Sequence, residues 1–110
     1  MADIDVGALA TNMGAAALGA LKEKWPLVRG YAEGEFRKLG ETAVMIQKGM
    51  AAGEINEAQA RILMDMQKHA MRSVLLTIEG LGSLAVEEAI NAALEVARGT
   101  INAAVKFALL

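Results

Sequence analysis

Apolar residues recur at helical spacing through the middle of the chain. The row consists of Phe36, Leu39, Ala43, Ile46 and Met50. These positions are separated by three and four residues in turn, so their side chains share one face of an α-helix in the manner of a heptad repeat. We therefore predict a helix over residues 35–51 that packs through this row.

A turn signal follows this helix directly. Gly53 suits the left-handed conformation that ends many helices, and Asn56 with Gln59 three residues later matches a capping box. Ile55, just before the cap, is placed to contact the first turn. A second helix over residues 56–79 should therefore run antiparallel to the first. It is expected to face the first helix through Leu63, Met66, Ala70, Val74 and Ile78, with Ile62 beside them.

The first segment, residues 3–24, is dense in small residues. Gly7, Thr11, Ala15 and Gly19 recur every four positions and would form a smooth stripe on a helix, against which another helix can approach closely. We favour a helix that becomes firm against a partner. The alternative is a partly ordered arm, because each glycine costs ~1 kcal/mol relative to alanine in a helix. The Trp25-Pro26 pair then predicts a kink or a new helix start.

The last helix is expected over residues 84–109. Gly80 and Gly82 weaken the helix before it and Ser83 can cap the new one, although a kinked helix that continues through residues 80–82 is an alternative. Most of the circumference of the last helix is apolar. Its polar residues form one narrow stripe: Glu88, Asn91, Glu95, Arg98, Asn102 and Lys106. Such a helix must be covered, because an ordinary surface helix has a narrower apolar face.

Three arrangements would bury the apolar face of this last helix. The helix is the central helix of a bundle, or copies pack side by side in a homo-oligomer, or a ring of copies inserts into a membrane with the polar stripe facing water. The residues expected to make helix-packing or oligomer contacts are Ala89, Ala93, Ala97, Ile101 and Ala104, together with Phe36, Leu39, Ile46 and Met66.

Composition supports an all-α fold. The chain has 110 residues, of which 55% are hydrophobic but only 4% aromatic, and its apolar residues are mainly good helix formers. We predict a single helical domain, either a small bundle or extended helices built on a central antiparallel hairpin. Its parts are a small-residue segment (1–24), the hairpin (35–79) and the apolar last helix (83–110). A core with so few rings is thin, which favours burial between chains.

Charge and residue counts exclude several classes of protein. The formal net charge is −2, so the basic footprint typical of nucleic-acid binding is missing. There is no cysteine and one histidine, so neither a thiolate nor a multi-histidine metal site can form. The start is acidic, which argues against a signal peptide, and no segment has the ~20 apolar residues of a membrane-spanning helix. We expect synthesis in the cytoplasm, without a prediction of the final location.

Two groups of residues could carry chemistry or binding. His69 has Asp65 and Arg72 one helical turn away, an arrangement that could serve acid–base work but is more typical of an exposed helix surface. Five methionines cluster around the hairpin: Met45, Met50, Met64, Met66 and Met71. They are interpreted mainly as core residues, with an adaptable binding face as the alternative.

These patterns predict a non-enzymatic protein without catalytic residues, cofactor or metal. We expect a structural or assembly subunit that forms homo-oligomers through its apolar helices, such as a component of a phage particle or another multi-subunit assembly. One alternative is a membrane-active protein whose oligomeric pore has the polar stripe facing water. Another is a soluble adaptor that binds a partner helix through the methionine-rich hairpin.

Overall fold

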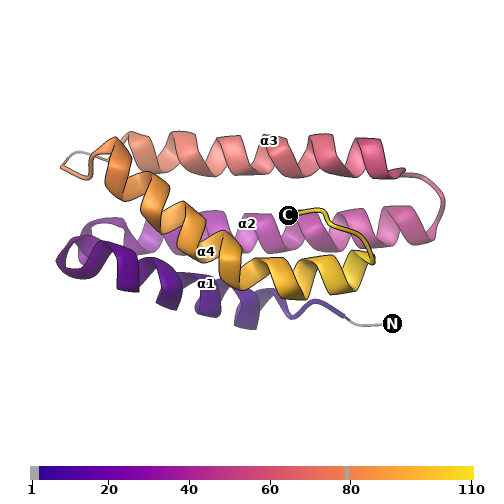
Figure 1. Cartoon of the computed structure of the whole chain (residues 1–110), viewed down its shortest axis with the longest axis horizontal. Helices are drawn as coiled ribbons and strands as arrows, with labels where there is room; N and C mark the ends of the chain where they lie inside the picture. The colour runs from indigo at the N-terminus through magenta and orange to yellow at the C-terminus, as the bar shows by residue number, and fades with distance from the viewer. Residues whose placement is uncertain (1–2, 79) are drawn as a thin grey trace.

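The computed structural model describes residues 3–78 and 80–110. Within them the chain forms α1 (Val6–Leu21), the short 3-10 helix η1 (Lys22–Lys24), α2 (Trp25–Ala51), α3 (Glu57–Leu76) and α4 (Ser83–Val105), and contains no strand. The helices alternate in direction and lie side by side in an elongated bundle of 44 × 22 × 19 Å (Figure 1). The predicted all-α class is confirmed.

Helix α2 is longer than the predicted helix. It begins at Trp25, with Pro26 in its first turn where the missing N–H costs nothing, so the predicted new start is confirmed. Gly30 and Gly34 lie inside the helix on its exposed side. The helix continues through them because Val28 and Ala32 on the opposite side are buried in the core. The predicted packing row is buried at Phe36, Leu39, Ala43 and Ile46, and half-buried at Met50.

The hairpin turn has the predicted geometry. Gly53 adopts a φ of +75°. The Asn56 side chain accepts a 2.8 Å hydrogen bond from the Gln59 N–H, and the Gln59 side chain accepts one of 3.0 Å from the Asn56 N–H. This capping box starts α3 at Glu57. The helix ends at Leu76, before the predicted residue 79, and Glu79 lies outside the described residues.

The predicted packing face of α3 was wrong. The buried residues of this helix are Ala60, Met64, Met71 and Leu75. By contrast Met66 is 63% exposed and Ala70 is exposed, while Leu63, Val74 and Ile78 are only half-buried. The helix is rotated by about one residue, or ~100°, from the prediction. The cause is that α3 packs against α4 as well as α2, so its buried face points between the two neighbours.

Helix α4 is separate from α3 and shorter than predicted. Gly82, with a φ of +76°, is the residue before the helix, and Ser83 lies inside the first turn instead of capping it. The alternative of one continuous helix is therefore wrong. At the other end, Lys106 is left-handed and the chain turns back. The Asn102 side chain accepts hydrogen bonds from the N–H groups of Leu109 and Leu110, each 2.9 Å long, which hold this tail.

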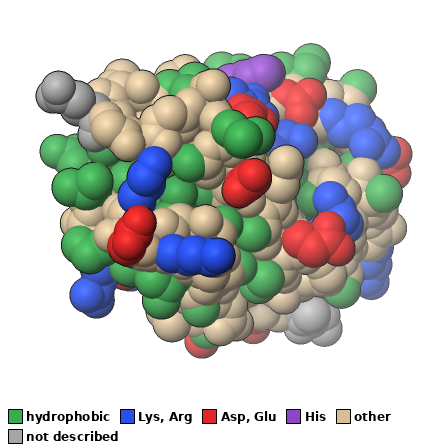
Figure 2. Space-filling model, turned by 60° about the vertical axis from the view of Figure 1, so that its left-hand side comes forward, with side chains coloured by type: hydrophobic (Ala, Val, Ile, Leu, Met, Phe, Trp, Pro, Cys, Tyr) green, Lys and Arg blue, Asp and Glu red, His purple; other side chains and the backbone are tan. Residues whose placement is uncertain are grey.

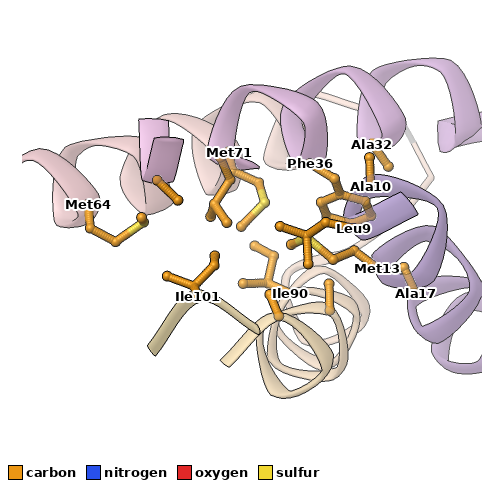
Figure 3. Close-up of a cluster of buried hydrophobic side chains, with 14 of the residues drawn as sticks. Leu9, Ala10, Met13, Ala17, Ala32, Phe36, Met64, Met71, Ile90 and Ile101 are labelled. Carbon is orange, nitrogen blue, oxygen red and sulfur yellow. The ribbon is translucent and has the colours of Figure 1, made fainter. Parts of the chain in front are cut away.

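Helix α1 is a regular helix inside the bundle and not a loose arm. The Asp5 carboxylate accepts a 3.0 Å hydrogen bond from the Ala8 N–H and caps its first turn. Its buried side chains contact α4 and α2. Figure 3 shows Leu9, Met13 and Phe36 pointing toward Ile90 in the shared core. Packing within one chain therefore supplies the support that we expected from a partner.

The core also contains two polar side chains, Glu35 and Gln47, that no pattern in the sequence had indicated. Glu35 is 5% exposed, and its carboxylate lies 3.0 Å from the Lys38 ammonium, which reaches it from solvent. Gln47 donates a 3.2 Å hydrogen bond to the Ala104 carbonyl oxygen and so links α2 to the end of α4. Both are satisfied, as buried polar groups must be.

Candidate association surface

The structure places most of the predicted contact residues inside one chain. The buried residues are Ala89, Ala93, Ala97, Ile101 and Ala104 of α4, and Phe36, Leu39 and Ile46 of α2. Met66 alone lies on the surface. Much of the apolar face of α4 is thus covered by the other helices of the same bundle, as in the first of the three arrangements, while Leu84 and Val96 stay exposed. A surface for association must be sought elsewhere.

The polar stripe of α4 faces outward. Asn102 is half-buried and holds the tail, and the other members are exposed: Glu88, Asn91, Glu95, Arg98 and Lys106. The Arg98 guanidinium donates to the Glu95 carboxylate along the helix. The stripe is therefore the solvent-facing side of a bundle helix.

His69 does not form an acid–base pair with Asp65. The Asp65 carboxylate lies 3.4 Å from the Lys68 ammonium, while His69 Nδ1 lies 3.5 Å from Nη1 of Arg72. Arg72 in turn donates a 2.5 Å hydrogen bond to Glu87 and joins α3 to α4. Figure 2 shows the imidazole at the upper surface. Among residues 3–78 and 80–110 no cluster of three possible metal ligands occurs.

The outer face of α1 is unusual for a surface helix. None of its sixteen residues is charged. Its exposed positions are Ala8, Thr11, Asn12, Ala15, Leu18 and Gly19. A solvent-facing helix side normally carries charged residues, so an exposed side of small neutral residues needs an explanation. We call these six residues the α1 face. They include three members of the predicted small-residue stripe, which therefore points away from the bundle.

A groove of about 550 Å³ runs beside the α1 face, between α1 and α2. Small residues of α1 form one side, among them Gly14 and Ala15, and α2 forms the other side. The α2 residues that line the groove are Trp25, Arg29, Glu33 and Arg37. Figure 1 shows the two helices side by side along this length, joined by the reversal at η1. The α1 face and the groove form one continuous surface.

Charged side chains border this surface along α2. Arg29 Nε donates a 3.1 Å hydrogen bond to Glu33 Oε1, and both side chains are largely exposed. Arg37, one turn further, makes no ion pair with any residue that the structure describes. The three side chains follow one another at four-residue intervals, so positive, negative and positive groups alternate along the edge.

Part of this surface could have been found in the sequence. The absence of charge between Val6 and Leu21 is visible there, and so is the small-residue stripe. The groove could not be found, because it exists only where η1 reverses the chain and sets Trp25 and Arg29 beside α1. A kink at the same place would have separated them.

Comparisons of the chain with protein-family models, curated proteins and solved structures find no match. None of the helices in the described residues has the length and apolar character to cross a bilayer.

Proposed function

We propose that this protein is a non-enzymatic subunit that self-associates, with the α1 faces of two copies packed against each other. The observation that carries the proposal is an exposed helix side without any charge, made of small residues. A subunit of this kind would serve a larger assembly, such as a phage particle, as a building block.

Small residues favour such a contact for a geometric reason. Where Ala15 and Gly19 meet their counterparts, the two helix backbones can approach closely and gain dispersion contacts along their length. No charge on the α1 face has to be removed from water, which is the main cost of burying polar surfaces. Leu18 is 44% exposed, and the contact would bury its apolar area, which is in water in a single copy.

A second copy of this chain fits the α1 face better than a helix of an unrelated protein. In a two-fold contact each copy contributes the same surface, so that surface must complement itself. The α1 face meets this condition because it is neutral. The alternating Arg29, Glu33 and Arg37 meet it as well, because a two-fold axis can place Glu33 of each copy opposite Arg37 of the other. Arg37 would thereby gain an ion pair that it lacks among the described residues of its own chain.

The size of the surface indicates reversible association. A helix of sixteen residues is about 24 Å long, and a stable interface buries about 800 Å² on each partner. One helix side is too narrow to supply this area alone. The adjoining groove and the α2 edge must contribute, and we expect a dimer whose population depends on protein concentration.

Sedimentation equilibrium of two matched variants tests the proposal. Ala15→Glu places a carboxylate in the centre of the α1 face, while Ala70→Glu makes the same change at an exposed alanine of α3. We expect the native chain and Ala70→Glu to dimerise with rising concentration and Ala15→Glu to remain a folded monomer. A native chain that is monomeric at every concentration, or an Ala15→Glu variant that dimerises normally, would contradict the proposal.

A further inference from the structure

A second apolar surface lies at the opposite end of the bundle, where α2 turns into α3. Two hollows of about 730 and 260 Å³ adjoin there, and both are lined by Glu54 and Ile55. The larger extends over Val44 and Met45 of α2, and the smaller over Ile62 and Leu63 of α3. We call the apolar side chains of this region the hairpin surface: Met45, Ile55, Ile62, Leu63 and Met66.

The hairpin surface exposes large side chains that the core does not use. Met45 is 49% exposed, Ile62 is 60% exposed, and Met66 lies one turn beyond Ile62 on the same helix. Met64 and Met71 by contrast are fully buried. The methionines of the hairpin therefore divide into core residues and surface residues. Exposed methionines adapt their shape to an apolar partner because their side chains are unbranched and flexible.

The charges around the hairpin surface are mostly negative. Glu41 and Glu54 line the larger hollow together with one basic residue, Lys48. Neither carboxylate forms an ion pair within the described part of the chain. An apolar floor within an acidic rim complements a helix that has an apolar side flanked by lysine or arginine.

We propose that the hairpin surface binds a basic amphipathic helix of a partner protein. The apolar side of that helix covers Met45, Ile55 and Ile62, and its basic residues lie against Glu41 and Glu54. This function is separate from self-association, because it uses neither α1 nor the groove. The protein would then be a subunit that recruits a second protein.

A second copy of this chain does not fit the hairpin surface. Two such surfaces face to face would bring acidic rims together, which is unfavourable. The α1 face is uncharged, and the outer side of α4 carries Glu88 and Glu95 as well as Arg98. The outer side of α2 does combine Leu27 and Tyr31 with basic residues, but it adjoins Arg29 and Arg37, which the proposed dimer contact uses. We therefore assign the hairpin surface to another protein.

Titration with a designed peptide tests this proposal. The probe is a synthetic amphipathic helix of leucine and lysine, compared with a leucine and glutamate helix of the same pattern. The protein carries 13C-labelled methionine methyl groups and the Ala15→Glu substitution, so the result does not depend on self-association. We expect the lysine peptide to shift the methyl signals of Met45 and Met66 with little effect on Met64 and Met71, and the glutamate peptide to shift none.

A matched pair of double variants tests the role of the rim. Glu41→Lys with Glu54→Lys should weaken binding of the lysine peptide about tenfold, since two exposed ion pairs are lost. Glu23→Lys with Glu88→Lys makes the same change in net charge at exposed sites elsewhere and should leave the affinity unchanged. Equal loss in both variants, equal binding of both peptides, or shifts confined to other methionines would overturn the proposal.

Discussion

Gly49 and Ile55 are in direct contact where α2 ends and the hairpin turn begins. A Cβ atom on Gly49 would lie 2.7 Å from Ile55 Cγ1 and closer still to Cδ1, which no real contact allows. The carbonyl oxygen of Gly49 also accepts hydrogen bonds from the N–H groups of Glu54 and Ile55, of 2.8 and 3.2 Å. The missing side chain therefore lets the turn fold tightly onto the last turns of α2.

Substitution of this glycine should destabilise the protein. Gly49→Ala gains up to ~1 kcal/mol of helix propensity but overpacks the site and displaces the half-buried Ile55, which costs about 1–3 kcal/mol. We expect a net loss of about 1 kcal/mol in the free energy of unfolding, measured by urea denaturation. Gly34→Ala is the control, because a Cβ there meets nothing within 4 Å and should stabilise the helix. A Gly49→Ala variant as stable as Gly34→Ala would contradict the described contact.

A charge on the inner side of α4 should unfold the chain. Ala93 is fully buried, so the carboxylate of Ala93→Glu would have no partner and would cost about 3–5 kcal/mol, a large part of a typical domain's stability of about 5–15 kcal/mol. Asn91→Asp on the exposed stripe should change stability by less than about 0.5 kcal/mol. Circular dichroism melting distinguishes the two variants. Similar melting temperatures would mean that the wrong face of α4 has been assigned to the core.

The first helix should depend on its cap. Asp5→Ala removes the hydrogen bond to the Ala8 N–H and should cost about 1 kcal/mol of stability. Asp3→Ala removes the same charge two residues earlier and serves as the control. Hydrogen exchange of the α1 amides measures the difference, and Asp5→Ala should raise exchange in α1 more than in α3. Equal effects of the two substitutions would show that the cap contributes nothing.

The packing of α4 argues against the alternative of a membrane pore. The apolar side of α4, including Ala97 and Ile101, is buried against the other helices, so insertion into lipid would first require the bundle to open. We predict that the native protein leaves dye-filled liposomes intact. Leakage with the native chain that disappears when Glu95 and Arg98 are both replaced by leucine would restore the pore interpretation.

Local signals were the most predictable from the sequence. The capping box of Asn56 with Gln59 and the left-handed Gly53 involve interactions across only three or four residues, so their residue types suffice to identify them. The packing row of α2 could be predicted for a similar reason. The apolar residues that recur at intervals of three and four positions are the ones that face the centre of the bundle.

The rotation of α3 could not be predicted in the same way. A hairpin alone would bury Met66 and Ala70 against α2, and the sequence pattern is compatible with that arrangement. The position of α4, which no pattern on α3 itself reveals, turns Met64 and Met71 inward instead. The same change exposes Met66 and leaves an apolar surface at the end of the hairpin. The side of α3 that stays exposed is thus decided by the packing of a neighbouring helix and not by the periodicity of α3 alone.

For the α1 face, the stripe was visible in the sequence but its direction was not. Ala15 and Gly19 could equally have packed inside the chain, where small residues also favour close contact. The larger side chains Leu9 and Met13 occupy the inner side of α1 because they bury more apolar area. Ala10, Gly14 and Ala17 are buried beside them, and the stripe residues Thr11, Ala15 and Gly19 are left outside.

The most direct measurement of the central claim places a reporter on the α1 face itself. The chain has no cysteine, so Ala15→Cys and Ala70→Cys each carry one unique thiol that can form a disulfide with a second copy. Such a disulfide forms only when the two Cα atoms come within about 7 Å of each other. Self-association through α1 predicts disulfide-linked dimers of the Ala15→Cys protein that increase with concentration under mild oxidation, and little cross-linking of the Ala70→Cys protein. Cross-linking of Ala70→Cys alone, or of neither protein while sedimentation shows dimers, would contradict the account.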